Sequence, residues 1–169
     1  MLHDPKRRQR QRRSASAAPD FSVQEESLFQ VVDHLPPLFV RFANAHATAP
    51  LDIDWQGLMR LAASGGLVVV TARYHDTVVG ICISVLTRPL MYRSTLYGTT
   101  IAIWLEPPYR AGLNGYRLAR ASKQALERRG CQRLFIAANQ ERLARLFERL
   151  GYCYSEHSYV SETHAGLSL

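Results

Sequence analysis

The sequence has no apolar run long enough to cross a membrane. Its longest apolar stretches, Val78–Leu86 and Ile101–Leu105, are far shorter than the roughly 18 residues that a membrane-spanning helix needs. This excludes a span, and we expect no membrane partner. The basic start of the chain leads into Ser, Ala and Pro residues instead of an apolar segment, which is unlike a secretory signal. We therefore expect a cytoplasmic protein.

Cysteine is also scarce. Cys82, Cys131 and Cys153 are odd in number, widely spaced and outside any CxxC or Cys/His pattern. This excludes a disulfide framework and a zinc site, and predicts thiols in the core. The histidines show no paired spacing, so no metal is expected. The glycine spacings of the dinucleotide-binding and Walker motifs are absent as well, which disfavours those two ligand classes.

The remaining composition is that of one globular domain with a basic tail. The chain has 169 residues, of which 47% are hydrophobic and 21% charged, and its net charge is +7. Residues 1–20 hold six basic side chains and two acidic ones. We expect a flexible basic tail over residues 1–20, a folded domain over 21–160 and a C-terminal tail over 161–169. Two roles stay open for the basic tail: a solvated arm, or a contact with nucleic acid or a partner protein.

Apolar residues at helical spacing predict three helices at the start of the folded domain. The first helix starts at a capping box of Ser22 and Glu25 and ends at Pro36 and Pro37. The second is a short helix over Leu38–Ala45, and the third is capped by Asp52 or Asp54. Gly65 and Gly66 end the last of them.

Runs of β-branched residues then predict strands. The expected elements are strands over Leu67–Tyr74, Val78–Leu86 and Thr99–Leu105, a helix over Leu113–Arg129, a strand over Arg133–Ala138, a helix capped by Asn139, and a strand over Cys153–Val160. The first three strands are expected to be antiparallel. This order predicts the α/β class, with a mixed, mostly antiparallel central sheet flanked by helices.

The junction from Leu105 to Tyr116 carries the chemistry. A strand runs into a loop with Gly112 and Gly115 and then into a long helix, so unpaired backbone N–H groups gather at the positive end of the helix dipole. The glycines permit close approach of a phosphate, and Arg110 adds a mobile positive charge. The segment therefore predicts an anion-binding site, with a plain strand-to-helix connection as the alternative.

The segment Pro107–Leu118, Pro-Pro-Tyr-Arg-Ala-Gly-Leu-Asn-Gly-Tyr-Arg-Leu, resembles motif A of the GNAT superfamily of acyl-CoA N-acyltransferases. Arg145–Tyr152 resembles the helix and turn of motif B, and the likeness extends over Leu67–Tyr159 in element order. Within the superfamily the loop is most similar to the Tyr-Arg-Gly-Gly type of bacteriophage members. The resemblance implies acetyl-CoA as acyl donor, with its pyrophosphate and pantetheine arm held by Ile103, Leu105, Arg110, Ala111, Gly112, Leu113, Asn114, Gly115 and Asn139.

The chain departs from the superfamily pattern in its catalytic groups. Phe147 stands where a tyrosine usually protonates the departing thiolate, and phenylalanine cannot donate a proton. Thr99 and Thr100 stand where many members carry a carboxylate, and the nearest acid, Glu106, is expected to be a solvated loop residue. No catalytic residue is assigned.

Two functions follow from the resemblance. The first is an N-acetyltransferase that moves an acetyl group from acetyl-CoA, a coenzyme A thioester, to an amine of an unidentified acceptor. The alternative is a catalytically silent GNAT-fold component, for instance of a phage virion, whose basic arm contacts nucleic acid or a partner protein. By analogy with the superfamily, a homo-oligomer through the C-terminal strand stays open.

Overall fold

The computed structural model describes residues 20–46 and 50–155. The chain divides into two compact units, one that ends at Ala137 and one that begins at Ala138. The first unit contains the sheet and every helix up to residue 137. The second contains helix α5 (Glu141–Arg149).

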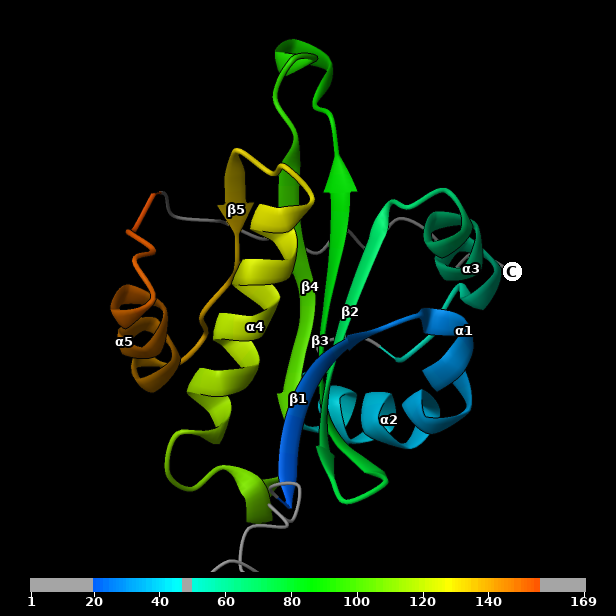
Figure 1. Cartoon of the computed structure of the whole chain (residues 1–169), viewed down its shortest axis with the longest axis vertical. Helices are drawn as coiled ribbons and strands as arrows, with labels where there is room; N and C mark the ends of the chain where they lie inside the picture. The colour runs from blue at the N-terminus through cyan, green and yellow to red at the C-terminus, as the bar shows by residue number, and fades with distance from the viewer. Residues whose placement is uncertain (1–19, 47–49, 156–169) are drawn as a thin grey trace, which may run out of the picture. The chain divides into compact units, whose positions relative to one another are not determined.

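A five-stranded mixed sheet forms the centre of the first unit (Figure 1). Its strands follow chain order: β1 (Phe21–Glu26), β2 (Leu67–Tyr74), β3 (Thr77–Thr87), β4 (Tyr97–Leu105) and β5 (Arg133–Phe135). The first three pairings are antiparallel, and β4 pairs with β5 in parallel. The predicted mixed and mostly antiparallel sheet flanked by helices is confirmed.

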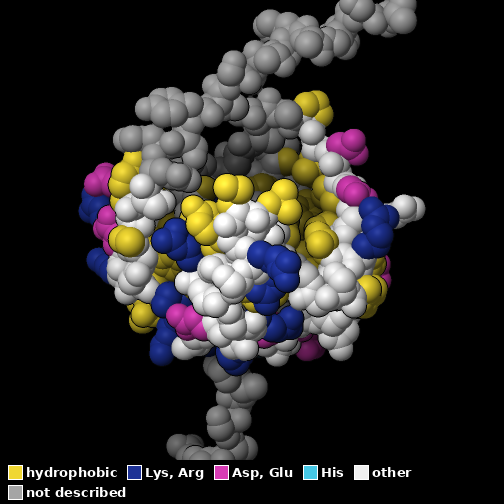
Figure 2. All heavy atoms as spheres, turned by 90° about the horizontal axis from the view of Figure 1, so that it is seen from above, with side chains coloured by type: hydrophobic (Ala, Val, Ile, Leu, Met, Phe, Trp, Pro, Cys, Tyr) yellow, Lys and Arg dark blue, Asp and Glu magenta, His cyan; other side chains and the backbone are white. Residues whose placement is uncertain are grey.

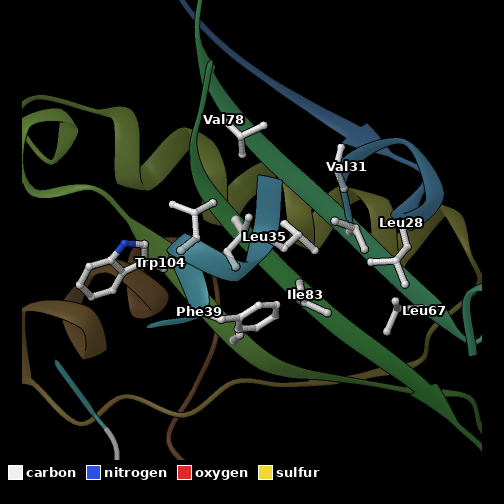
Figure 3. Close-up of a cluster of buried hydrophobic side chains, with 12 residues drawn as sticks. Leu28, Val31, Leu35, Phe39, Leu67, Val78, Ile83 and Trp104 are labelled. Carbon is white, nitrogen blue, oxygen red and sulfur yellow. The ribbon is translucent and has the colours of Figure 1, made fainter. Parts of the chain in front are cut away.

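Helices cover both faces of this sheet. One face packs against α1 (Leu28–Val31), α2 (Leu35–His46) and α3 (Trp55–Ala63), and the other against α4 (Asn114–Arg128). The 3-10 turn η2 (Val32–His34) connects α1 to α2. Two further 3-10 turns are η3 (Leu90–Tyr92) and η4 (Pro107–Tyr109). Side chains of β2 alternate between the faces, because Leu67 and Val69 join the first core while Val68 and Val70 join the second. Figure 3 shows the first core around Leu35.

The beginning of the folded region differs from the prediction. Residues 21–26 form strand β1 along β2, and not the capped start of a helix. The cap lies five residues later, where the Ser27 N–H donates to the side-chain oxygen of Gln30 at 3.2 Å. Ser22 and Glu25 lie in β1 instead. This strand pairs with β2, which is far along the chain, and local residue spacing does not indicate such a pairing.

Two prolines predicted to end the first helix lie inside the second. Pro36 and Pro37 occupy the first turn of α2, where backbone N–H groups need no partner within the helix. The short helix predicted over Leu38–Ala45 therefore begins three residues earlier. Asp54 caps α3 as one of the two predicted candidates, since its carboxylate accepts from the Gly57 N–H at 2.7 Å.

The C-terminal half is mostly as predicted. The strands and helix over residues 67–129 are confirmed to within about two residues, and Gly130 follows α4 with a φ of +79°. Strand β5 is shorter than predicted, and Gln140, not Asn139, occupies the N-cap of α5. Residues 153–155 are not in a strand, and the rest of the predicted final strand lies outside the described residues.

The buried polar groups of the first unit are paired. Cys82 is buried, its Sγ donates to Ser122 Oγ at 3.1 Å, and burial raises its pKa to about 11. Glu26 lies near Arg73 and accepts from Thr71 at 2.7 Å. Burial alone would raise the pKa of Glu26, yet hydrogen bonds from Arg73, Thr71 and Gln24 outweigh it and lower that pKa. The expectation of core thiols is right for Cys82 and wrong for the exposed Cys153.

Candidate functional site at the end of strand β4

Strand β4 is paired on both sides only at its start. Its partners in β5 are opposite Tyr97, Gly98 and Thr99, and β5 ends there. Residues 100–105 continue for about 20 Å along β3 with no strand on the other side among the described residues. Because β5 ends opposite Thr99, residues 100–105 of β4 have one side without a strand partner among the described residues, and this side is called the open edge.

The open edge presents the backbone of two predicted site residues. Along a strand, the backbone N–H and C=O groups of successive residues point alternately to the two sides. The Glu106 N–H donates to the Val79 oxygen on the β3 side at 2.8 Å, so Ala102 and Trp104 direct their backbone groups toward β3 as well. Ile103 and Leu105 therefore direct theirs toward the open side. The register shifts between Ile83 and Ser84, opposite a β-bulge at Ile101 that the sequence did not reveal.

The loop after β4 presents a run of backbone donors. Among the described residues, none accepts a hydrogen bond from the N–H groups of residues 111–116. The first bond of α4 runs from the Arg117 N–H to the Leu113 oxygen at 2.8 Å, which leaves the first helical N–H groups free. The N–H of Arg110 donates to the Pro107 oxygen at 3.2 Å. The Arg110 N–H therefore already has an acceptor, and the run of N–H groups without one begins at Ala111.

Gly112 shapes this loop. Its φ is +65°, a left-handed conformation that favours glycine, and a Cβ built there would meet no atom within 4 Å. Open space beside the backbone lets a ligand approach the N–H groups directly. Asn114 steadies the loop, since its side-chain amide donates to the Tyr109 oxygen at 3.1 Å.

The charge around the loop suits an anion. From Pro107 to Leu126 the charged side chains are Arg110, Arg117, Arg120 and Lys123, all basic. The first turn of α4 contains no acidic residue, although carboxylates are the usual stabilising side chains at a helix N-terminus. The helix dipole and these side chains together favour a negatively charged ligand.

Arg110 is held in place, which corrects the expectation of a mobile charge. Its Nε donates to the Leu105 oxygen at 2.7 Å, and its guanidinium lies 4.4 Å from the centre of the Trp104 ring. The side chain therefore fixes the turn from β4 into the loop. One of the carbonyl groups on the open edge is already paired with it.

Glu106 is not the solvated loop acid that the sequence predicts. Its side chain is 15% exposed and forms an ion pair with Arg41 of α2 at 2.5 Å. It also accepts from the indole N–H of Trp104 at 3.3 Å. Local spacing could not reveal this pair because its members are 65 residues apart. These contacts of Glu106 connect α2 to the end of β4.

The other candidates divide between the two units. Thr100 lies on the open half of β4, and its hydroxyl shares a hydrogen bond of 3.0 Å with Ser84. Asn139 and Phe147 belong to the second unit, where Phe147 is 4% exposed and lies near Tyr152. The structure therefore brings together the predicted residues from Ile103 to Gly115, while Asn139 stays a prediction.

No competing site stands out in the described chain. A groove of about 450 Å³ opens between β1, α1, α3 and β2, but its Glu25 and Glu26 are already paired with arginines. Residues 20–46 and 50–155 contain no group of three or more potential metal ligands. Across the same ranges no helix combines the length and hydropathy that a membrane span requires.

Solved structures share this fold. Ribosomal-protein-alanine N-acetyltransferase of Brucella melitensis biovar Abortus 2308 matches with a TM-score of 0.66 and 18% identity, over 85% of this chain and 97% of that chain. AAC(6')-Iy in complex with the bisubstrate analogue CoA-S-monomethyl-acetylneamine matches with a TM-score of 0.67 and 13% identity, over 86% and 99%. Glucosamine-6-phosphate N-acetyltransferase of Arabidopsis thaliana matches with a TM-score of 0.65 and 8% identity, over 84% and 97%.

A comparison with curated proteins found no match. At the identities above, the likeness to solved structures is one of fold. A family model settles the relationship, because that of the Acetyltransferase (GNAT) family matches residues 28–152, which is well over half of the chain. This chain therefore belongs to the GNAT family of acetyltransferases.

Proposed function

We propose that this protein is an N-acetyltransferase that moves the acetyl group of acetyl-CoA to an amine. One observation carries the proposal: the open edge of β4 leads directly into a loop whose N–H groups at residues 111–116 have no acceptor among the described residues. Members of the family use acetyl-CoA, and one similar structure contains a CoA analogue. Neither the bacteriophage subtype nor the silent alternative has support in these comparisons.

The chain's own groups divide the binding work. In this proposal the N–H groups from Ala111 through Gly115 bind the pyrophosphate, where the helix dipole and the basic side chains stabilise its charge. The backbone groups of Ile103 and the N–H of Leu105 pair with the pantetheine amides, as an added strand would. Arg110 acts indirectly, because its guanidinium holds the Leu105 oxygen. Asn139 is retained as a further pantetheine contact.

The transfer itself needs little from acidic or basic side chains. The amine nitrogen attacks the thioester carbon, the C–S bond breaks, the nitrogen loses a proton and the sulfur gains one. Phe147 cannot supply that proton, and Glu106 is engaged by Arg41 and Trp104. We therefore assign both proton transfers to water, with positioning as the main contribution of the protein.

The experiment is an assay of thiol release from acetyl-CoA by the full chain with a panel of primary amines. A further structure of this fold is an aminoglycoside acetyltransferase in complex with sisomicin. Sisomicin, glucosamine 6-phosphate and a peptide with N-terminal alanine therefore form the first panel. We expect release that depends on at least one amine and an acetylated product of matching mass. Binding of acetyl-CoA without release with any amine in the panel or in a wider primary-amine screen would contradict catalysis and favour the silent alternative.

Residues 1–20 carry a separate prediction. Their six basic side chains favour contact with nucleic acid or an acidic partner. All but Asp20 lie outside the described residues, so the prediction rests on charge alone. Removal of this tail is expected to abolish a salt-sensitive association with DNA while acetyl-CoA binding is retained.

A further inference from the structure

The turn between β3 and β4 displays consecutive apolar side chains. Leu90, Met91 and Tyr92 make up η3 and are 99%, 86% and 60% exposed. In Figure 1 this turn extends beyond the neighbouring strands, and Figure 2, which looks down on it, shows hydrophobic side chains beside Lys and Arg. Exposed apolar groups that adjoin one another commonly mark an interaction surface. Residues 88–93 are called the apolar tip below.

Arginines flank the apolar tip. Between Thr77 and Leu105 the only charged side chains are Arg88 and Arg93, one on each side of η3. Strands β3 and β4 therefore contribute no carboxylate near it. The tip is thus a small apolar surface with a basic rim. A complementary binding partner has an apolar interior and anionic groups at its surface.

The tip is held in its exposed position by the fold. The Tyr92 N–H donates to the Pro89 oxygen at 2.9 Å, and the Tyr92 ring stacks on Tyr97 with centroids 6.4 Å apart and planes 18° apart. The base of the turn is fixed by two bonds between Leu96 and Gln132, at 2.6 and 2.9 Å. These bonds fix the backbone of the turn, so the apolar side chains are presented outward.

We propose that the apolar tip binds the surface of an anionic lipid bilayer. Leu90 and Met91 would enter the boundary between headgroups and acyl chains, and Arg88 and Arg93 would pair with lipid phosphates. A second copy is a poorer occupant, because a symmetric contact would bring the arginines together. The expectation of no membrane partner rested on the length of apolar runs, which bears on spanning a bilayer and not on surface contact.

The position of the tip keeps the two activities separate. The tip precedes the start of β4 at Tyr97, whereas the open edge lies along residues 100–105 and the N–H groups follow the end of the strand. A bilayer bound at the tip therefore leaves the candidate acetyl-CoA site accessible. Vesicles are not expected to change acetyl-CoA affinity, whether or not the protein proves to be an acetyltransferase.

The test is sedimentation of the full chain with vesicles of phosphatidylcholine, with and without phosphatidylglycerol. Because the basic tail is present in every variant, its attraction to anionic lipid is common to all of them. We expect binding to the mixed vesicles and a loss of at least about tenfold for Leu90→Ser combined with Met91→Ser. Phe29→Ser, an exposed apolar residue on α1, is the matched control and should bind like the wild type.

A charge series completes the test. Arg88→Gln and Arg93→Gln should each weaken binding by about fivefold, while Arg60→Gln on α3 should leave it unchanged. Absence of wild-type binding, or tip variants that bind as the wild type does, would overturn the proposal. So would a concentration-dependent dimer that the double variant loses, in the absence of vesicle binding, since a second copy would then be the occupant.

Discussion

The two ends of strand β4 differ in what surrounds them. At the start, Gly98 is paired on both sides, and a Cβ there would lie 2.9 Å from Leu126 and 3.2 Å from Cys131. At the other end β3 is the strand partner, and the chain passes into Gly112, where a Cβ would meet nothing within 4 Å. Close packing maintains the fold at one end, and open backbone groups are available for a ligand at the other. Mutations at the two ends should therefore affect different properties.

The largest expected effect is at the open end. Gly112→Asp places a carboxylate beside the free N–H groups and should weaken acetyl-CoA binding by about a hundredfold, because like charges then face one another. Gly130→Asp is the matched control: Gly130 also has a positive φ and open space, but it follows the other end of α4. Isothermal titration with acetyl-CoA measures both. Equal losses in the two variants would show that backbone strain, and not the ligand site, is responsible.

Gly98→Val should disrupt the close packing at the start of β4. The added side chain overlaps Leu126, so we expect the free energy of unfolding in urea to fall by about 1–3 kcal/mol. Gly112→Ala is the comparison, with a cost of about 1 kcal/mol that comes from its positive φ alone. If Gly98→Val were the milder of the two, the packing at the start of β4 would be less close than described.

Arg110 stabilises the fold at the open end of β4 through contacts with Leu105 and Trp104. Arg110→Met removes the bond to the Leu105 oxygen and the cation–π contact with Trp104, and should lower unfolding stability by about 1 kcal/mol. Arg110→Lys should recover little of this, because an ammonium cannot stack on the ring as a guanidinium does. Arg120→Met, on the exposed side of α4, serves as control. A loss as large in the control would assign the effect to charge alone.

The smallest effect concerns pH and lies away from β4. Glu26 has a lowered pKa in the folded protein, so its contribution to stability is present above its ordinary pKa of 4.5 and is lost as the pH falls through its folded-state pKa. Glu26→Gln should remove this part of the acid sensitivity in urea unfolding. Acetyl-CoA affinity at neutral pH should stay the same. An altered affinity would mean that β1 and the open end are coupled.

The sequence predicted the strand, loop and helix around residues 105–116 better than the contacts of the neighbouring side chains. The glycines and the strand-to-helix order of Leu105–Tyr116 are local features, and so is the motif that resembles the GNAT superfamily. The pairing of Glu106 with Arg41 and the stacking of Arg110 on Trp104 depend on how α2 and β4 meet in the fold. Residue spacing along the chain does not contain that information, so the sequence alone predicts a solvent-exposed Glu106.

The same distinction explains the errors in the fold. Residues 21–26 have a capping pattern that fits a helix, yet pairing with β2 decides their conformation. The sequence predicts that Pro36 and Pro37 stop a helix, because it does not show that they fall in the first turn of the next one. The bulge at Ile101 arises from the register between β3 and β4, which no single strand specifies.

Hydrogen exchange with and without acetyl-CoA tests the central claim most directly. The N–H groups of residues 111–116 have no acceptor among the described residues, so they should exchange rapidly in the free protein. On addition of acetyl-CoA they should be protected together with Ile103 and Leu105, while residues 97–99 change little. Protection confined to other segments, such as the groove beside β1, with residues 103–116 unchanged, would contradict the account.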